Sequence, residues 1–176
     1  MAKRINIGKV PQGKEEAEKF LWTIPANTTV TAKILVDEDH LIESHLCQHN
    51  GKTWAYTGKG DPCEKLGVEP RFSVLVPCSV KTSSGKTYRV VRGPKAISNQ
   101  LSALALNHDL RGLVVTIERK DDRFAKYTIK PTGQKAAVEE DQDILVADIL
   151  EHIKQGTADE VAQWLGINTT FTEEEL

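Results

Sequence analysis

The pattern that decides the fold lies in residues 71–112, which read RFSVLVPCSVKTSSGKTYRVVRGPKAISNQLSALALNHDLRG. The runs 71–80 and 87–93 are rich in β-branched and aromatic residues, and the turn KTSSGK between them predicts a hairpin. Apolar residues at helical spacing follow the hairpin. They are Ile97, Leu101, Leu104 and Ala105. The stretch therefore predicts two strands and then a helix.

Three more strands flank this stretch. Residues 28–36, TTVTAKILV, alternate between apolar and polar side chains, and residues 113–120 and 123–131 form a second pair of strand-like runs around an Asp-Asp turn. Short strands at this spacing are also compatible with a sandwich. A helix between the third and fourth strands favours a mainly β protein, a five-stranded OB-fold Greek-key barrel.

Composition divides the rest of the chain around this barrel. The stretch between the first two strands lacks clear periodicity and is interpreted as an irregular insertion rich in Cys and His. The expected parts are an N-terminal arm (1–20), the barrel (21–136, with the insertion at 37–70), a linker with C-terminal helices (137–167) and an acidic tail (168–176).

The C-terminal extension is predicted to contain two short helices. Leu145, Ile149 and Ile153 recur at the spacing of one helix face. Thr157 and Glu160 have the spacing of a capping box, and Gly166 is suited to end the second helix. The pattern allows these helices to pack on the barrel or on each other.

Charge is distributed very unevenly along the chain. Residues 1–136 contain 22 Lys and Arg against 14 Asp and Glu, a net charge of +8, whereas residues 137–176 contain one Lys against 11 acids, a net charge of −10. Such asymmetry is typical of nucleic-acid contact by the basic part and of an interaction tail in the acidic part.

Other features limit the class of protein. The sequence has no apolar run long enough to span a membrane and no secretory signal pattern, so we expect a cytoplasmic protein. Three cysteines without an export signal argue against a disulfide framework. The sequence lacks the common phosphate-loop, zinc-protease and serine-hydrolase motifs, and a non-enzymatic protein is expected.

Basic and aromatic residues interleave on three segments, 51–59, 87–93 and 119–130. Such side chains suit binding of single-stranded nucleic acid, because cations follow the phosphates and flat rings stack on the bases. Phe72 and Phe124 are instead expected to be core residues or cross-strand packing partners, and Cys78 is expected in the core. The predicted DNA-binding residues are Lys52, Trp54, Tyr56, Lys86, Tyr88, Arg92, Lys126 and Tyr127.

The insertion also contains five residues that bind metals in other proteins, His40 among them. A structural zinc ion would explain how an irregular segment stays folded, and exposed histidines with free thiols are the alternative. The predicted ligands are His45, Cys47, His49 and Cys63.

Residues 69–133 resemble the OB-fold single-stranded DNA-binding proteins encoded by bacteriophages. The resemblance implies a protein that coats single-stranded DNA in replication, recombination or repair, and a zinc-binding insertion with a Cys-x-x-Cys element. Here GDPCEKLG has Gly60 where the first cysteine of that element would fall.

The resemblance also implies that the acidic tail recruits replication and recombination proteins or competes with DNA for the protein's own groove. The tail residues given these roles are Phe171, Glu173, Glu174, Glu175 and Leu176. A terminus without partners is the simpler interpretation.

Two other functions remain open. The acids and histidines of residues 37–49 could serve a metal-dependent nuclease or another DNA-processing enzyme. An OB-fold module could instead bind RNA or another protein. The sequence does not define an oligomeric state.

Overall fold

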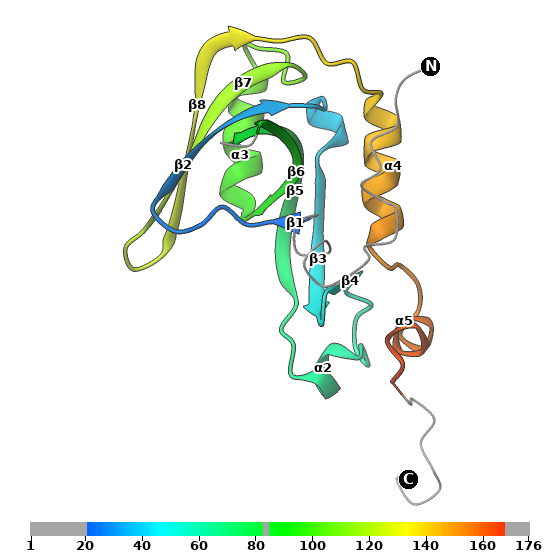
Figure 1. The fold of residues 1–176 in the computed structure, drawn as a ribbon. Helices are drawn as coiled ribbons and strands as arrows, with labels where there is room; N and C mark the ends of the chain where they lie inside the picture. The colour runs from blue at the N-terminus through cyan, green and yellow to red at the C-terminus, as the bar shows by residue number, and fades with distance from the viewer. Residues whose placement is uncertain (1–20, 83–84, 168–176) are drawn as a thin grey trace, which may run out of the picture.

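The computed structural model describes residues 21–82 and 85–167, with the backbone alone at residues 82 and 85–89. The chain is mainly β, with one mixed sheet and a few helices (Figure 1). The strands are β1 (Leu21–Trp22), β2 (Thr28–Ile34), β3 (Ile42–His49), β4 (Lys52–Ala55), β5 (Arg71–Thr82), β6 (Gly85–Gly93), β7 (Leu113–Asp121) and β8 (Ala125–Lys135). The helices are η2 (Glu38–His40), α2 (Cys63–Leu66), α3 (Lys95–Ala105), α4 (Gln142–His152) and α5 (Ala158–Leu165).

The strand order in the sheet is β1-β6-β5-β2-β7-β8. The short β1 runs parallel to β6, and the other pairs are antiparallel. The five strands and the helix predicted from the sequence correspond to β2, β5, β6, α3, β7 and β8. Among the described strands, β8 pairs with β7 alone, so the sheet is open at that edge.

Helix α3 packs across the open edge. The side-chain amide of Gln100 donates a hydrogen bond to the carbonyl oxygen of Tyr127 and accepts one from the backbone nitrogen of Ile129, both at 2.8 Å. These are the backbone groups of β8 that would otherwise face a missing strand. Gln100 therefore takes the place of a strand neighbour for part of β8.

The two faces of β5 are buried in different clusters, because side chains alternate along a strand. Val74, Val76, Cys78 and Val80 belong to the main core, which Ile97 and Leu101 of α3 complete, as predicted for Cys78 and for this helix. The opposite face is covered by α4. Leu75, Val90 and Leu46 pack there with Leu21, Ile149 and Ile153.

The region expected to be an irregular insertion contains a β-hairpin, so that expectation was wrong. Strand β3 extends the sheet, because residues Ile42–Leu46 pair with the first half of β5. It then turns through Asn50 and Gly51, which have φ values of 49° and 76°, and pairs with β4. Such positive φ values at both positions suit an Asn-Gly turn in a two-residue hairpin.

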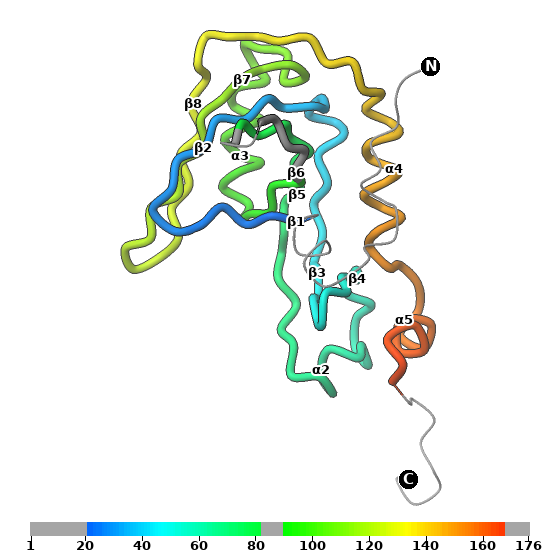
Figure 2. Tube along the Cα trace, in the orientation of Figure 1, coloured from blue at the N-terminus to red at the C-terminus, as the bar shows by residue number. Residues whose placement is uncertain are grey.

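Both C-terminal helices form where the sequence predicts them. Asp141 caps α4 by accepting hydrogen bonds from the backbone nitrogens of Asp143 and Ile144. Thr157 caps α5 by accepting one from the backbone nitrogen of Glu160, as the capping box predicts. The chain path brings both helices beside β3 and β4 (Figure 2), where the α4–α5 connection pairs with β4 through Lys154.

Candidate functional site

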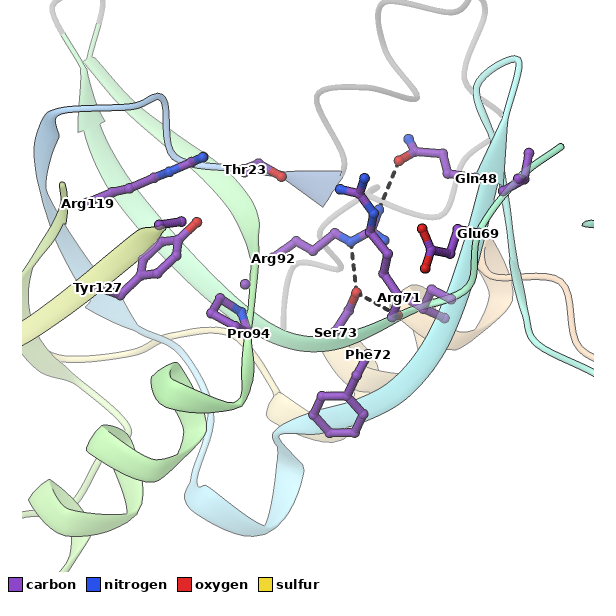
Figure 3. Close-up of a pocket in the computed structure, with 14 residues that line it drawn as sticks. Thr23, Gln48, Glu69, Arg71, Phe72, Ser73, Arg92, Pro94, Arg119 and Tyr127 are labelled. Atoms are coloured by element: carbon purple, nitrogen blue, oxygen red, sulfur yellow. Dashed lines mark hydrogen bonds between the residues drawn. The ribbon is translucent and has the colours of Figure 1, made fainter. Parts of the chain in front are cut away.

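A groove with a volume of about 630 Å³ opens beside the ends of β5 and β6 (Figure 3). Three arginines reach it from different strands: Arg71 from β5, Arg92 from β6 and Arg119 from β7. In Figure 3, Arg119 lies with Tyr127 on one side of the groove and Arg71 lies with Gln48 and Glu69 on the other. The remaining lining residues of the groove are Thr23, Leu46, Val68, Phe72, Ser73, Gly93, Pro94 and Ala125.

Arg92 is held in a fixed orientation within this groove. Its Nε donates to Ser73 Oγ and its Nη1 donates to Gln48 Oε1, each over 2.9 Å. Both acceptors are uncharged. Burial, followed by the nearby positive charge of Arg71, lowers the pKa of the Arg92 guanidinium. Arg92 is thus a positioned cation in surroundings that disfavour its charge, and an anionic ligand would relieve that cost.

Arg71 adds a second positive charge next to Arg92. Ser73 and Arg71 lie two residues apart on β5, and Arg92 pairs with Leu75, so strand alternation places Arg71, Ser73 and Arg92 on one face. Within residues 21–82 and 85–167, no ion pair involves Arg71 or Arg92. Neither guanidinium therefore has a carboxylate within ion-pair distance in that part of the chain, although Glu69 lines the same groove.

Arg119 is in a different electrostatic state. It makes a two-pronged ion pair with Asp121, with both N–H···O distances at 2.8 Å, and donates from Nη1 to the carbonyl oxygen of Ile24. The hydrogen bond with Asp121 raises the Arg119 pKa. Its guanidinium carbon lies 5.7 Å from the ring centre of Tyr127. Arg119 therefore shapes the wall of the groove and brings little free charge to it.

The predicted stacking residues are only partly available on the surface. Trp54 is 0% exposed and lies in a cluster with Cys47, Cys63 and Val161, so the prediction that its ring forms a stacking platform was wrong. Tyr127 lines the groove but is only 6% exposed, too little for a base to stack on its face. Tyr56 is 38% exposed but is not among the groove residues.

Neither of the two phenylalanines that were expected in the core or in cross-strand packing is buried, but Phe72 does pack across strands, opposite His45 of β3. Phe124 is 83% exposed at the turn between β7 and β8, and Phe72 is 37% exposed. Figure 3 shows Phe72 pointing away from Arg71 and Ser73. His45 contacts its ring edge-on, with ring centres 5.3 Å apart, and Lys95 Nζ lies 5.9 Å from its centre.

The predicted lysines are scattered. Lys52 donates to the carbonyl oxygen of Trp164 and lies 5.0 Å from the centre of its ring, so it anchors α5 and does not line the groove. Lys126 is exposed on β8, also outside the groove lining. The side chains of Lys86 and Tyr88 are outside the described part of the chain. Of the eight predicted DNA-binding residues, Arg92 and Tyr127 are brought together.

On β6, Val90 lies two residues before Arg92 and therefore on the same face of the strand. Val90 is 0% exposed and packs with Leu21, Ile149 and Ile153. Helix α4 therefore covers the middle of this face. Arg92, two residues further along the strand, lines the groove.

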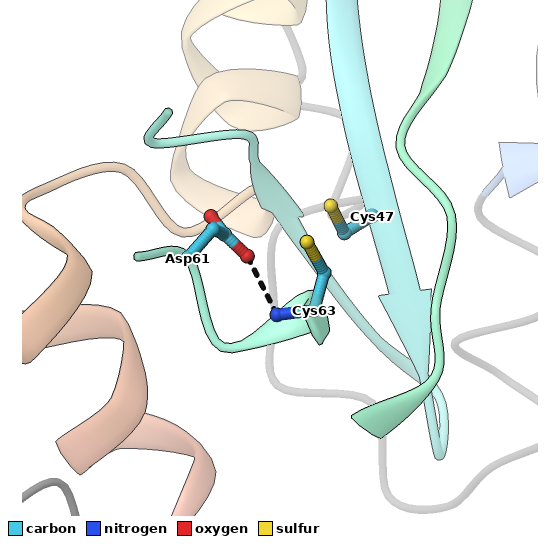
Figure 4. Close-up of side chains that lie close together, drawn as sticks. All are labelled: Cys47, Asp61 and Cys63. Carbon is cyan, nitrogen blue, oxygen red and sulfur yellow. Dashed lines mark hydrogen bonds between the residues drawn. The ribbon is translucent and has the colours of Figure 1, made fainter. Parts of the chain in front are cut away.

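A second cluster brings together Cys47, Asp61 and Cys63, whose ligand atoms all lie within 4.8 Å of one another (Figure 4). All three residues are buried, and the group could hold a metal ion. Burial, with the hydrogen bond to Asp61 next in size, raises the pKa of Cys63 to about 11. Burial and the charge of Asp61 raise the pKa of Cys47 to about 12.

His45 and His49 do not join this cluster among the described residues, so the predicted four-ligand set is incomplete. His45 points instead to Phe72. Asp61, which was not predicted, takes part. Structural zinc sites have four ligands as a rule, and the described residues supply three.

The remaining predictions have separate outcomes. His40 of the acidic stretch 37–40 pairs with Asp143 of α4, with 2.8 Å between Nε2 and Oδ1. The tail residues Phe171, Glu173, Glu174, Glu175 and Leu176 lie outside the described residues. No helix in residues 21–82 and 85–167 combines the length and the apolar character needed to cross a bilayer.

No protein-family model, curated protein or solved structure matches this chain.

Proposed function

We propose that this chain binds single-stranded DNA through the groove at the ends of β5 and β6. The observation that carries the proposal is the pair Arg71 and Arg92, two adjacent cations on one face without an acidic partner in the described part of the chain. Guanidinium groups suit phosphate because they present several donors in a planar fork. The net charge of +8 over residues 1–136 adds a longer-range attraction for a polyanion.

The strand pairings support an OB-fold as the basis of this function. Strand β2 pairs with both β5 and β7, β5 pairs with β6, and β7 pairs with β8, while α3 connects β6 to β7. OB-folds bind oligonucleotides on the face of their second and third strands. Here those strands correspond to β5 and β6. Arg71 at the start of β5 and Arg92 near the end of β6 lie at the same end of this strand pair.

An oligonucleotide titration tests the proposal. A fluorescently labelled oligo-dT is titrated with protein at several salt concentrations, and the affinity is expected to fall as salt rises, because phosphate contacts release counterions. Arg71→Ala is expected to weaken binding and flatten the salt dependence. Lys130→Ala, which removes an equal charge from an exposed position outside the groove lining, is the matched control. Absence of binding at low salt would refute the proposal.

Two further assays separate the alternative functions. Incubation of a single strand with Mg²⁺ or Mn²⁺ is expected to leave it intact, whereas cleavage would indicate a nuclease. A ribo-oligonucleotide of equal length tests RNA preference, since only RNA offers the 2′-hydroxyl.

We further propose that residues 168–176 recruit replication or recombination proteins. Their composition supports this role, with Phe171 and Leu176 as apolar anchors around three consecutive glutamates. Deletion of these residues is expected to tighten DNA binding if the tail also competes for the groove. An unchanged affinity would leave recruitment as the tail's single proposed role.

For the cysteine cluster we propose a structural role. A zinc ion there would be held by the two thiolates and a carboxylate oxygen of Asp61, and it would supply cross-linking and no chemistry. Metal analysis of the purified protein distinguishes a zinc-bound from a metal-free cluster. Stoichiometric zinc would require a fourth ligand beyond Cys47, Asp61 and Cys63.

A further inference from the structure

Two guanidinium groups, Arg71 and Arg92, meet at one end of the groove, and neither forms an ion pair within the described residues, although Glu69 also lines this end. Arg119 is already paired with Asp121, but the hydrogen-bond acceptors of Arg92 are the neutral groups of Ser73 and Gln48. A phosphodiester in a nucleic-acid strand carries one negative charge, whereas a phosphomonoester carries about −1.5 to −2 at pH 7. Two guanidinium groups without an ion-pair partner in the described part of the chain can both contact a phosphomonoester dianion.

The donor geometry at Arg92 is fixed before a ligand arrives. Ser73 and Gln48 hold Nε and Nη1, which leaves Nη2 and the second hydrogen of Nη1 free of these two bonds. Because the side chain is already ordered, binding an anion costs little further side-chain entropy. The exposed Arg71 can then approach the same anion.

The groove does not continue along the β6 face beyond Arg92. Val90, two residues earlier on the same face, is fully buried under Ile149 and Ile153. On the side of Gln48 and Arg71, Glu69 places a negative charge at the groove (Figure 3). A DNA strand that continued toward Val90 would have to displace packed apolar side chains. A DNA strand that continued past Glu69 would have to bring its next phosphate close to a carboxylate.

We propose that the Arg71 and Arg92 end of the groove binds a terminal nucleotide phosphate, a phosphomonoester dianion, and so recognises a strand end. This inference rests on the proposed function, since the same groove is the one that binds the strand. A volume of about 630 Å³ lies within the range of roughly 300–1,000 Å³ typical of small-ligand sites, which suits the last nucleotides of a strand. A free nucleoside monophosphate offers the same chemistry.

The experiment compares three oligo-dT strands of equal length with an internal fluorophore, so that both ends are free. One has a 5′-phosphate, one has a 3′-phosphate and one has hydroxyl groups at both ends. One of the phosphorylated strands is expected to bind about tenfold more tightly than the hydroxyl strand, because a charge-assisted hydrogen bond to the dianion is gained. Unlabelled thymidine monophosphate is added as a competitor to test the free nucleotide as a source.

Two variants locate the effect. Arg71→Ala removes an exposed side chain and is expected to abolish the end preference, and Arg92→Lys keeps the charge but loses the fork and is expected to reduce it severalfold. Lys130→Ala is expected to retain the preference. Equal affinity for the three strands, with salt-dependent binding intact, would overturn the strand-end inference and leave the proposed function standing. Failure of all three strands to bind would overturn both.

Discussion

Trp54 and Asp61 are joined by a buried hydrogen bond, in which the indole Nε1 donates to Oδ1 over 3.0 Å. The same oxygen accepts from the backbone nitrogen of Cys63, and Oδ2 accepts from the backbone nitrogen and hydroxyl of Thr57. Four donors thus converge on one carboxylate. Asp61 organises the segment between β4 and α2 from within.

Asp61→Ala is expected to destabilise the protein by about 3 kcal/mol or more, because it leaves the buried donors of Trp54 and Cys63 without acceptors. Urea unfolding followed by tryptophan fluorescence measures the loss. Glu64→Ala, an exposed acid in the neighbouring helix, is the control and is expected to change stability little. Equal stability of the two variants would contradict the organising role of Asp61.

Stability is also expected to depend on pH through Asp61. Burial alone would raise its pKa, but the hydrogen bonds from Thr57, Cys63 and Trp54 lower it below the usual value. Because the unfolded pKa is about 3.9, this contribution is complete above that value and is lost as the pH falls through the lower folded pKa. Urea unfolding between about pH 5 and pH 2 should show a steeper decline for the unmodified protein than for Asp61→Asn. Parallel curves of stability against pH for the two proteins would show that other carboxylates determine the pH dependence.

Gln100→Ala is expected to cost about 2–4 kcal/mol, since the backbone groups of Tyr127 and Ile129 lose their partners at the open edge of the sheet. Thermal unfolding measures the change. Asn99→Ala, an exposed neighbour on the same helix, gives the baseline for α3. A loss no larger than that of Asn99→Ala would mean that water replaces the amide without cost.

Asp121→Asn should release the charge of Arg119 into the groove. If the groove binds a single strand, the variant is expected to bind more tightly, and the slope of log affinity against log salt should steepen by about 0.7 for one added phosphate contact. Asp109→Asn, which releases Lys135 away from the groove, removes an equal charge as the control. Identical slopes for the two variants would indicate a purely general charge effect.

Thr157→Ala is expected to lower stability by about 1 kcal/mol, because α5 loses the cap on the backbone nitrogen of Glu160. Chemical unfolding measures the change in stability. Thr132→Ser, a substitution on β8 that keeps the hydroxyl group, is the control. A loss near zero would mean that packing of Val161 and Trp164 alone holds the helix.

The elements with strong local signals were predictable. The alternation of β2 and the cap at Thr157 are read directly from neighbouring residues. Strand β3 was missed because buried and exposed side chains do not alternate regularly along it. Leu46 and Cys47 are adjacent in sequence, and both are buried, each in a different cluster. Its turn, Asn50-Gly51, was the signal that could have revealed the hairpin.

The site was less predictable, because side-chain burial is decided by distant segments. Trp54 has basic neighbours in sequence, yet Val161 of α5 and Cys63 enclose it. Arg92 was identified from its strand, but its partner Arg71 comes from the start of β5 and was missed. Asp121 lies two residues from Arg119 on β7, so strand alternation was a local signal for their ion pair, whereas the sequence does not reveal that no described acid forms an ion pair with Arg71.

The backbone of the α4–α5 connection is joined to β4 at two points: Ala55 donates to the carbonyl oxygen of Lys154, and Lys154 donates to that of Thr53. Residues 137–167 are thereby held against the sheet and form part of the folded domain. A shortened protein that ended at residue 136 would lose the residues that cover Leu75 and Val90, and it would expose an apolar surface to water. Any attempt to isolate the minimal folding unit should accordingly retain everything through residue 167.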